Sequence, residues 1–337
     1  MGNTNLLNKL ISKQNLTTEE TQLFLNDVIK GVATPAQIGA ILIALRMKGE
    51  TPVEIVGFIK AMRENMIHVN ASNAIDVCGT GGDSSGTFNI STAVAFVVAG
   101  AGVKVAKHGN RAASSKCGSA DVLEGLGVNL QLSPQQAEEV FNKAGMVFLF
   151  APNFHPSMKN VIAVRKELKV RTVFNYLGPF ANPASVEKQL IGVPNVEIAE
   201  KLAEVGKTLA YKHLLIVTSE DGLDELSISS KTILFEVKDH SVKQSTIDPV
   251  NYGLQKVPNE EVLGGSAQQN ASFIREILQG KKSSKRDIVI FNSAFAIYVA
   301  GVVSDIKEGI ELAEKSIDNG KAKLVLENLV KETQKYA

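Results

Sequence analysis

The sequence has no excess of charge of either sign. Its 337 residues include 36 Lys plus Arg against 35 Asp plus Glu, so the formal net charge is +1. A nucleic acid or an anionic membrane is usually bound by a strongly basic surface. The near balance argues against both as the main partner, although a local basic patch fits within a balanced total.

The sequence is also poor in cysteine and in long apolar runs. Cys78 and Cys117 are the two cysteines, too few for a disulfide framework, and we expect free thiols as in the cytosol. The most apolar stretch, residues 93–106, contains glycines and Lys104, so it does not match a membrane span. The first residues lack a signal-peptide layout. These features together predict a cytoplasmic location and one large or two ordinary domains.

Glycines and residues with hydroxyl side chains are concentrated between Asp76 and Thr92. This segment follows a short apolar stretch and precedes an apolar helix predicted at 93–102. Gly79, Gly81 and Gly82 can adopt positive φ, so their N–H groups can converge on an anion at a helix N-terminus. The segment matches neither the P-loop nor the dinucleotide fingerprint. The alternative is a glycine-rich turn without a ligand.

Asp83 lies inside this glycine-rich segment. A carboxylate there repels a phosphate unless it pairs with a cation or accepts hydrogen bonds from sugar hydroxyls. The segment therefore predicts a ribose or a metal ion beside the phosphate.

A second polar segment follows a strand predicted at 103–106. Residues 107–119 carry three cations if His108 is set aside, three serines and two glycines, and a helix is predicted at 120–126. Ligands bind where strands pass into helices in open α/β sheets. A solvated basic loop is the alternative, but two such segments after consecutive strands favour a ligand site.

An acidic loop follows the strand predicted at 214–218. Asp221, Asp224 and Glu225 supply hard carboxylate oxygens. Such oxygens commonly bind Mg²⁺ together with the phosphates of a substrate. The alternative is an acidic turn that caps a helix.

The order of elements predicts two domains. Thr17 with Glu20, Thr34 with Gln37, and Thr51 with Glu54 have capping-box spacing and predict a small all-helical domain over residues 1–70. After a hinge at 71–74, helices and strands alternate, which predicts a large α/β domain over 71–337 with a mainly parallel sheet flanked by helices. Residues 279–286 are predicted to form a basic surface loop.

Seven motifs follow one another along the chain: Gly79-Thr-Gly-Gly-Asp83, Asn89-Ile-Ser-Thr92, Lys107-His-Gly-Asn-Arg111, Gly118-Ser-Ala-Asp-Val-Leu-Glu124, Val164-Arg165, Asn175-Tyr-Leu-Gly-Pro179 and Asp221-Gly-Leu-Asp-Glu-Leu-Ser227. In this order they resemble the motifs of the anthranilate phosphoribosyltransferases of tryptophan biosynthesis. The resemblance runs from 44–51 to 292–301. It implies transfer of 5-phosphoribosyl from phosphoribosyl pyrophosphate to the amine of anthranilate. It also implies a homodimer formed through the N-terminal helical domain, and a helical contribution to that domain from about 165–185.

The resemblance assigns residues to two substrates and a metal. The site for phosphoribosyl pyrophosphate comprises Gly79, Gly82, Asp83, Thr87, Asn89, Ile90, Ser91, Thr92, Lys107, Gly109, Arg111, Ser114, Ser115 and Ser119. The site for anthranilate comprises Gly79, His108, Asn110, His155, Arg165, Gly178 and Pro179, with Lys107, Asn110 and Arg165 in catalytic roles. Two Mg²⁺ ions are implied, one held by Asp224 and Glu225 and the other contacted by Ser91.

Arg165 is the residue that this resemblance places on the carboxylate of anthranilate. A guanidinium can form two parallel hydrogen bonds to a carboxylate. An Arg on an amphipathic helix is otherwise often a surface ion pair, and His155 can equally be an ordinary residue at a helix start. The sequence departs from the family at Lys166, Tyr176, Ser157 and Ser219-Glu220, which leaves the shape of the aromatic site open.

Two alternatives remain. Pyrimidine nucleoside phosphorylases share the architecture but bind inorganic phosphate and need no Asp-Glu metal pair. A noncatalytic nucleic-acid-binding relative would carry a basic groove and lack that pair. Neither feature is found in the sequence.

Overall fold

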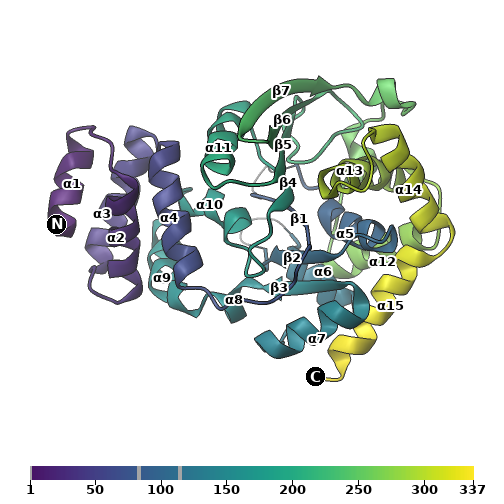
Figure 1. Cartoon of the computed structure of the whole chain (residues 1–337), viewed down its shortest axis with the longest axis horizontal. Coiled ribbons are helices and arrows are strands. Elements are labelled where there is room, and N and C mark those ends of the chain that lie inside the picture. Colours follow the sequence, from purple (N-terminus) through teal and green to yellow (C-terminus); the bar gives the residue numbers. More distant parts are fainter. Residues whose placement is uncertain (1, 82–84, 113–115) are drawn as a thin grey trace.

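The computed structural model describes residues 2–81, 85–112 and 116–337, and its helical N-terminal lobe contacts a larger α/β lobe (Figure 1). The N-terminal lobe contains α1 (Asn3–Ile11), α2 (Thr18–Ile29), α3 (Pro35–Lys48) and α4 (Pro52–Glu64). The side chains of Thr17, Thr34 and Thr51 each accept a hydrogen bond from the N–H three residues on, and all three capping boxes are complete. The helix starts predicted from these residues are therefore confirmed.

A later segment of the chain returns to this helical lobe. Helix α9 (Lys159–Leu168) packs against α2 and α3, and the short α10 (Phe174–Leu177) contacts α4. The rings of Phe58 and Phe174 meet edge to face at 5.8 Å between centroids, an arrangement that adds to the energy of burial. The returning segment starts at α9, slightly before the predicted 165–185. The domain boundaries themselves stay a prediction.

The large lobe is built on a five-stranded sheet of order β1-β4-β5-β6-β7. Its strands are β1 (Asp76–Gly79), β4 (Lys188–Gly192), β5 (His213–Ser219), β6 (Thr232–Lys238) and β7 (Ser241–Ile247). The first three are parallel, and β6 and β7 form an antiparallel hairpin at one edge. Strands β2 (Val105–Gly109) and β3 (Met146–Phe150) form a parallel pair joined to the start of β1 by one bridge between Ile75 and Val105. The predicted mainly parallel sheet is confirmed.

Helices cover both faces of the sheet (Figure 1). Helix α11 (Val196–Thr208) packs on β5 and β6 from the side of the N-terminal lobe, while α5 (Ile90–Gly100) and α13 (Ser284–Ala300) pack on β1 and β4 from the other side. The remaining helices are α6 (Ser119–Leu126), α7 (Pro134–Ala144), α8 (Ala151–Phe154), α12 (Ala267–Leu278), α14 (Ile306–Asp318) and α15 (Lys321–Gln334). Nearly all of α5 is buried, so its N-terminus is held firmly at the end of β1.

Two local predictions are wrong. Lys107 and His108 lie within β2, paired with Phe148 and Leu149 of β3, instead of in a loop after the strand. Charged side chains are rare in buried strands, which is why the strand was predicted to end earlier. Residues 284–286 belong to α13 instead of a basic surface loop, and Arg286 is buried and paired with Asp318 at 2.8 Å.

Among the described residues, no helix combines the length and the apolar character needed to cross a membrane.

Candidate active site

The glycine-rich segment runs from the end of β1 to the start of α5. Gly81 has φ +70°, a conformation that favours glycine. The N–H of Thr80 donates to the carbonyl of Gly192 at the end of β4, at 2.9 Å. The N-cap residue of α5, Asn89, makes no side-chain cap to the helix. The start of α5 therefore offers the positive end of a helix dipole to an anion.

Lys107 lies directly beneath this loop. Its Nζ donates to the carbonyl of Val77 on β1 at 2.5 Å and to the Oγ of Ser91 in the first turn of α5 at 3.2 Å, and the residue is only 1% exposed. Burial raises the pKa of nearby Asp76 to about 6, and the charge of Lys107 lowers that pKa in part. A buried ammonium below an anion loop is well placed to attract phosphate oxygens.

The carboxylate of Asp224 also contacts this loop. The N–H of Gly81 donates to its Oδ2 at 3.1 Å, and a Cβ added at Gly79 would lie 2.5 Å from that oxygen. A Cβ at Gly192 would collide with the backbone of Asp224. Glycine at 79 and 192 is therefore required for the acidic loop to approach β1 and β4 so closely.

The loop that carries Asp224 and Glu225 is fixed at both ends. Ser219 at the end of β5 donates to the carbonyl of Glu225 at 2.7 Å. Asn292 of α13 accepts from the N–H of Leu226 and donates to its carbonyl, both at 2.9 Å. Asp221 is used inside the loop, where it accepts from the Oγ of Ser227 at 2.7 Å. Asp221 thus shapes the loop, while Asp224 reaches the glycine segment.

The oxygen donors here suit Mg²⁺. Among the described residues, no group of three or more His, Cys, Asp or Glu side chains could hold a metal ion by itself. Mg²⁺ is commonly bound by one or two carboxylates together with waters and substrate phosphates. The Asp224 carboxylate against a loop suited to phosphate fits that mode of binding.

Two histidines form the next part of the site. The rings of His108 on β2 and His155 after α8 lie 5.2 Å apart, and the Nδ1 of His108 donates to the carbonyl of Gly178 at 3.1 Å. Burial lowers the pKa of His108 to about 3, with a smaller effect from His155, and lowers that of His155 to about 4. Both rings are therefore neutral at physiological pH. The buried Nε2 atoms of both find no partner among the described residues.

Gly178 presents open space beside these rings. A Cβ at Gly178 would meet no atom within 4 Å. The adjoining Pro179 is buried, and its carbonyl accepts a hydrogen bond from Gln189 at 2.9 Å. The predicted aromatic-site residues His108, His155, Gly178 and Pro179 are thus brought to one place.

Two arginines come from the returning segment. Arg165 on α9 lies over the ring of Phe174 at 5.8 Å, and burial lowers the pKa of its guanidinium. A guanidinium carries five N–H donors, and burial of this one makes a charged ligand group a favourable partner. Arg171 donates to the carbonyl of Gly81 at 3.1 Å, which links the returning segment to the glycine loop.

Arg111 is used within the protein. Its guanidinium makes ion pairs with Glu124 at 2.5 Å and Asp121 at 3.1 Å, both on α6. The predicted contact with phosphoribosyl pyrophosphate is therefore in competition with two carboxylates. The Oγ of Ser119 donates to the carbonyl of Asn110 at 3.3 Å, so these two predicted site residues adjoin where α6 begins.

Asn89 connects three elements at the start of α5. Its side-chain NH₂ donates to the carbonyl of Cys117 at 3.1 Å, and its Oδ1 accepts from Asn270 of α12 at 2.9 Å. Thr87 beside it forms a bridge with Leu263. Ile90 and Thr92 are buried in the first turn of α5, and Gly109 ends β2. The predicted residues Gly82, Asp83, Ser114 and Ser115 lie outside the described residues.

Several supporting residues were not found by sequence reasoning. Asn182 and Gln189 both donate to Asp76, at 2.8 and 3.3 Å. Asn270 donates to Asn89, and Asn292 accepts from the N–H of Leu226 in the acidic loop. Only an unexpectedly polar residue in an apolar segment signals such a role, and that signal does not identify the partner.

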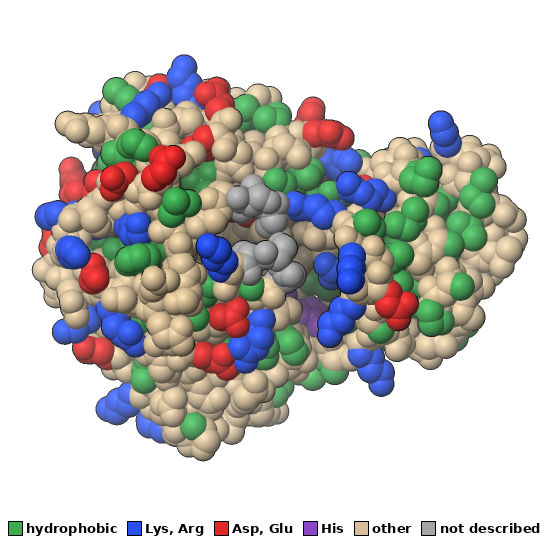
Figure 2. Space-filling view, turned by 180° about the vertical axis from the view of Figure 1, so that it is seen from behind, with side chains coloured by type: hydrophobic (Ala, Val, Ile, Leu, Met, Phe, Trp, Pro, Cys, Tyr) green, Lys and Arg blue, Asp and Glu red, His purple; other side chains and the backbone are tan. Residues whose placement is uncertain are grey.

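The surface around the site is hollowed. Lys and Arg side chains gather along the border of a hollow between the larger and the smaller lobe, and a His side chain is visible within it (Figure 2). A basic border suits a highly anionic ligand.

Two known family models match this chain, one for each lobe. The family model described as "Glycosyl transferase family, helical bundle domain" matches residues 4–66, and the one described as "Glycosyl transferase family, a/b domain" matches residues 71–323. The anthranilate phosphoribosyltransferase of Thermoanaerobacter sp. (strain X514) is 49% identical over 318 residues, which are 94% of each chain. The chain belongs to the anthranilate phosphoribosyltransferase family.

Solved structures of anthranilate phosphoribosyltransferases share the whole fold. The enzyme from Thermus thermophilus matches with a TM-score of 0.91 and 38% identity, covering 98% of this chain and 99% of its own. The Saccharomyces cerevisiae enzyme in complex with PRPP and Mg matches with a TM-score of 0.90 and 28% identity, covering 99% of this chain and 98% of its own. The enzyme class and the fold inferred from the motifs are confirmed.

Proposed function

We propose that this chain transfers the 5-phosphoribosyl group from phosphoribosyl pyrophosphate to the amine of anthranilate and releases pyrophosphate, a step of tryptophan biosynthesis. The observation that carries this proposal is the meeting of Asp224 with the glycine loop above the buried Lys107. That arrangement suits a pyrophosphate with a metal ion. The names of the relatives and the PRPP and Mg complex of the yeast enzyme support the same substrate.

The glycine loop and Lys107 act on the leaving group. The bond between the anomeric carbon and the pyrophosphate oxygen breaks, and its electron pair leaves with the pyrophosphate. Charge therefore becomes positive on the ribose and negative on the leaving oxygen. Donors that are already fixed toward that oxygen stabilise this charge without reorganisation. Lys107 is fixed in this way by Val77 and Ser91, and Asn89 and Thr87 would hold the ribose and its phosphate.

Asp224 and Glu225 would hold one Mg²⁺ and Ser91 would contact a second. When bound, such ions neutralise charge on the departing pyrophosphate. The protein contributes the position of the acidic loop, fixed by Ser219 and Asn292.

The aromatic acceptor would lie between Arg165 and the two histidines. Arg165 would bind its carboxylate with two parallel hydrogen bonds, and the neutral rings of His108 and His155 would flank its ring. Asn110 would orient the amine, whose nitrogen forms the new bond to the anomeric carbon, and one of its two protons then passes to water. Holding the amine in line with the breaking bond supplies much of the acceleration. Closure of the hollow between the lobes would exclude water, which otherwise hydrolyses the activated sugar.

The loss of anthranilate fluorescence tests this function. Purified protein should consume anthranilate only when phosphoribosyl pyrophosphate and Mg²⁺ are both present, with one pyrophosphate formed per anthranilate lost. Cleavage of a pyrimidine nucleoside by inorganic phosphate should not be detected. Nucleoside cleavage without anthranilate consumption would contradict the proposal.

We also propose a cytoplasmic homodimer formed through the N-terminal helical lobe. Ile11, Val32 and Met47 on that lobe are 67%, 62% and 83% exposed, and a small helical unit buries a limited core of its own. Light scattering at micromolar concentration should give twice the 36.1 kDa of one chain. Met47→Glu should shift the mass toward the monomer, and a monomeric parent protein would contradict the proposal.

A further inference from the structure

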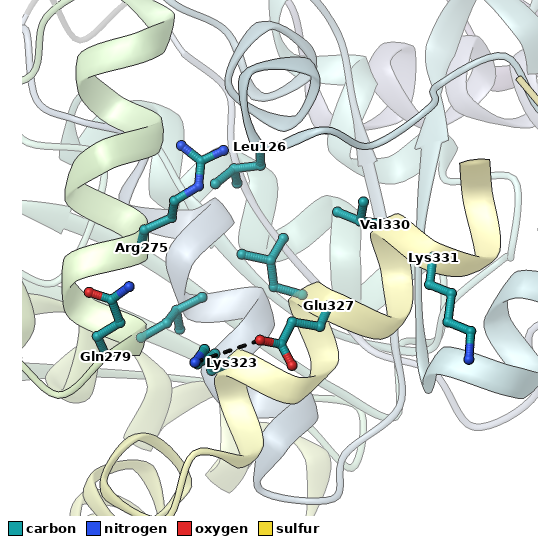
Figure 3. Close-up of a pocket in the computed structure, with 9 residues that line it drawn as sticks. Leu126, Arg275, Gln279, Lys323, Glu327, Val330 and Lys331 are labelled. Carbon is teal, nitrogen blue, oxygen red and sulfur yellow. Dashed lines mark ion pairs between the residues drawn. The ribbon is translucent and has the colours of Figure 1, made fainter.

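A second hollow lies away from the proposed active site, between α6, α12 and α15. Its volume is about 390 Å³, within the usual range for sites that bind small molecules. Leu126, Leu278, Leu326 and Val330 supply its apolar lining. Arg275 of α12 and Gln279, the residue after that helix, lie across from α15 (Figure 3). Lys323, Glu327 and Lys331 of α15 complete the lining.

The polar rim of this hollow is mainly cationic. Arg275, Lys323 and Lys331 carry three positive charges against the single carboxylate of Glu327, which lies 3.7 Å from Lys323. The guanidinium of Arg275 donates to the carbonyl of Gly125 at 2.9 Å, which uses one of its five N–H groups. An apolar lining with a cationic rim is complementary to a flat apolar group that bears one carboxylate or sulfonate.

The helices that line this hollow also hold Asn89 of the proposed active site. Cys117 lies two residues before α6 and its carbonyl accepts from Asn89, and α12 carries Asn270, which donates to Asn89. The two helices pack closely at Gly125, where a Cβ would lie 3.3 Å from the carbonyl oxygen of Ala267. A change in the separation of α6 and α12 therefore moves the two groups that orient Asn89.

We propose that this hollow binds a small amphipathic organic anion and that its occupancy alters binding of phosphoribosyl pyrophosphate through Asn89. The ligand would contact α6, α12 and α15 together and so favour one spacing of these helices, and only differential binding of that kind can shift the affinity of a second site. The second half of this proposal, the effect on phosphoribosyl pyrophosphate, rests on the proposed function. The binding half, that the hollow binds an organic anion, does not.

Isothermal titration with 2-naphthoate and its uncharged analogue 2-naphthamide tests the binding half. The parent protein should bind naphthoate more tightly than naphthamide. Lys323→Gln combined with Lys331→Gln should weaken naphthoate by roughly threefold or more, as loss of two exposed charge contacts implies. Lys321→Gln is the matched control because Lys321 lies on the same helix, is exposed and does not line the hollow. It should leave binding unchanged.

Three results would overturn the binding half. They are no binding of naphthoate at millimolar concentration, equal binding of naphthoate and naphthamide, or a Lys323→Gln, Lys331→Gln protein that binds as the parent does. The last result would place the ligand elsewhere, including the cleft between the lobes.

Steady-state kinetics test the coupling. Naphthoate should change the KM for phosphoribosyl pyrophosphate at least about twofold in the parent, and the naphthoate concentration that gives half of this change should rise in the double Lys variant by the same factor as its Kd. An effect on the KM for anthranilate alone, equal in both proteins, would mean competition at the aromatic site and would overturn the coupling. A protein that binds naphthoate as expected but lacks transferase activity would contradict the proposed function and leave the binding half intact.

Discussion

The N–H of Gly81 donates a hydrogen bond to the carboxylate of Asp224, 143 positions further along the chain. This contact joins the loop after β1 to the loop after β5, although β4 lies between these strands in the sheet. It places a carboxylate, which can bind a metal ion, against a glycine-rich loop of the kind that binds anions. Most of the proposed mechanism depends on this meeting.

Asp224→Asn combined with Glu225→Gln should reduce kcat at saturating substrates by at least about a hundredfold, a loss of transition-state stabilisation of about 3 kcal/mol. The reason is that the charge of these carboxylates matters most as pyrophosphate leaves. Binding of anthranilate, followed by its fluorescence, should change little. Glu220→Gln removes one charge from the same loop at an exposed position and should be neutral. Near-normal turnover of the double variant in Mg²⁺ would place the metal elsewhere.

Ser219→Ala should remove hydrogen bonds that hold the acidic loop in place, while both proposed Mg²⁺ ligands, Asp224 and Glu225, remain. The Oγ of Ser219 holds the carbonyl of Glu225 and the hydroxyl of Thr232, and leaving buried partners unsatisfied costs about 1–3 kcal/mol. The Mg²⁺ concentration needed for half-maximal activity should therefore rise several-fold while the KM for anthranilate stays constant.

Ser229→Ala is the matched control for this variant. Ser229 lies in the same loop, and its buried Oγ has no hydrogen-bond partner among the described residues. An equal change in both variants, or a loss of stability in Ser219→Ala with no change in Mg²⁺ dependence, would assign Ser219 a purely structural role.

His108 and His155 should make the protein less stable as the pH falls from about 6.5 to 4. Their folded pKa values are about 3 and 4, whereas an unfolded imidazole titrates near 6.5, so the unfolded chain binds more protons in this window. Asp76 acts in the opposite direction, since its folded pKa of about 6 makes the folded state bind more protons between pH 3.8 and 6.

Urea unfolding at several pH values separates these contributions. The combined His108→Gln, His155→Gln variant should lose less stability than the parent between pH 6.5 and 4, and the Asp76 contribution cancels in the comparison. Replacement of the exposed His68 by Gln should leave the slope unchanged. The same slope in all three proteins would show that the two buried rings are not held neutral.

The sequence predicted helix starts and the sheet because these depend on local patterns. Thr17, Thr34 and Thr51 begin helices through contacts within four residues, which a spacing rule can detect. Lys107 was misplaced because its position depends on Ser91 and on the carbonyl of Val77, and composition alone does not reveal a cation buried in a strand.

The sequence predicted which residues form the site more fully than it predicted the contacts between them. Motifs and resemblance identified Asp224, His108 and Gly178, and the structure brings each to the same region. The pairing of Arg111 with Glu124 and Asp121 was not foreseen, nor was the support that Asn270 gives to Asn89. Such contacts join elements far apart in the chain, so no local spacing encodes them. The antiparallel strands β6 and β7 were also not predicted.

In the proposed mechanism, the cleft between the lobes holds anthranilate by its carboxylate on Arg165. A cycle of two enzymes and two acceptors tests it most directly, with kcat/KM measured for anthranilate and for aniline, which has the amine but no acid group. Lys166→Ala, an exposed neighbour on α9, serves as the control. Arg165→Ala should reduce kcat/KM for anthranilate by roughly 10–100 fold, as expected for a hydrogen bond to a charged group.

Aniline should be a poor acceptor for the parent enzyme and should lose little more in the Arg165→Ala variant, while the KM for phosphoribosyl pyrophosphate stays nearly constant. That result would assign the guanidinium to the substrate's acid group. Equal losses for anthranilate and aniline would contradict the claim and make Arg165 structural, with Arg171 and Arg111 the next candidates for the anchor.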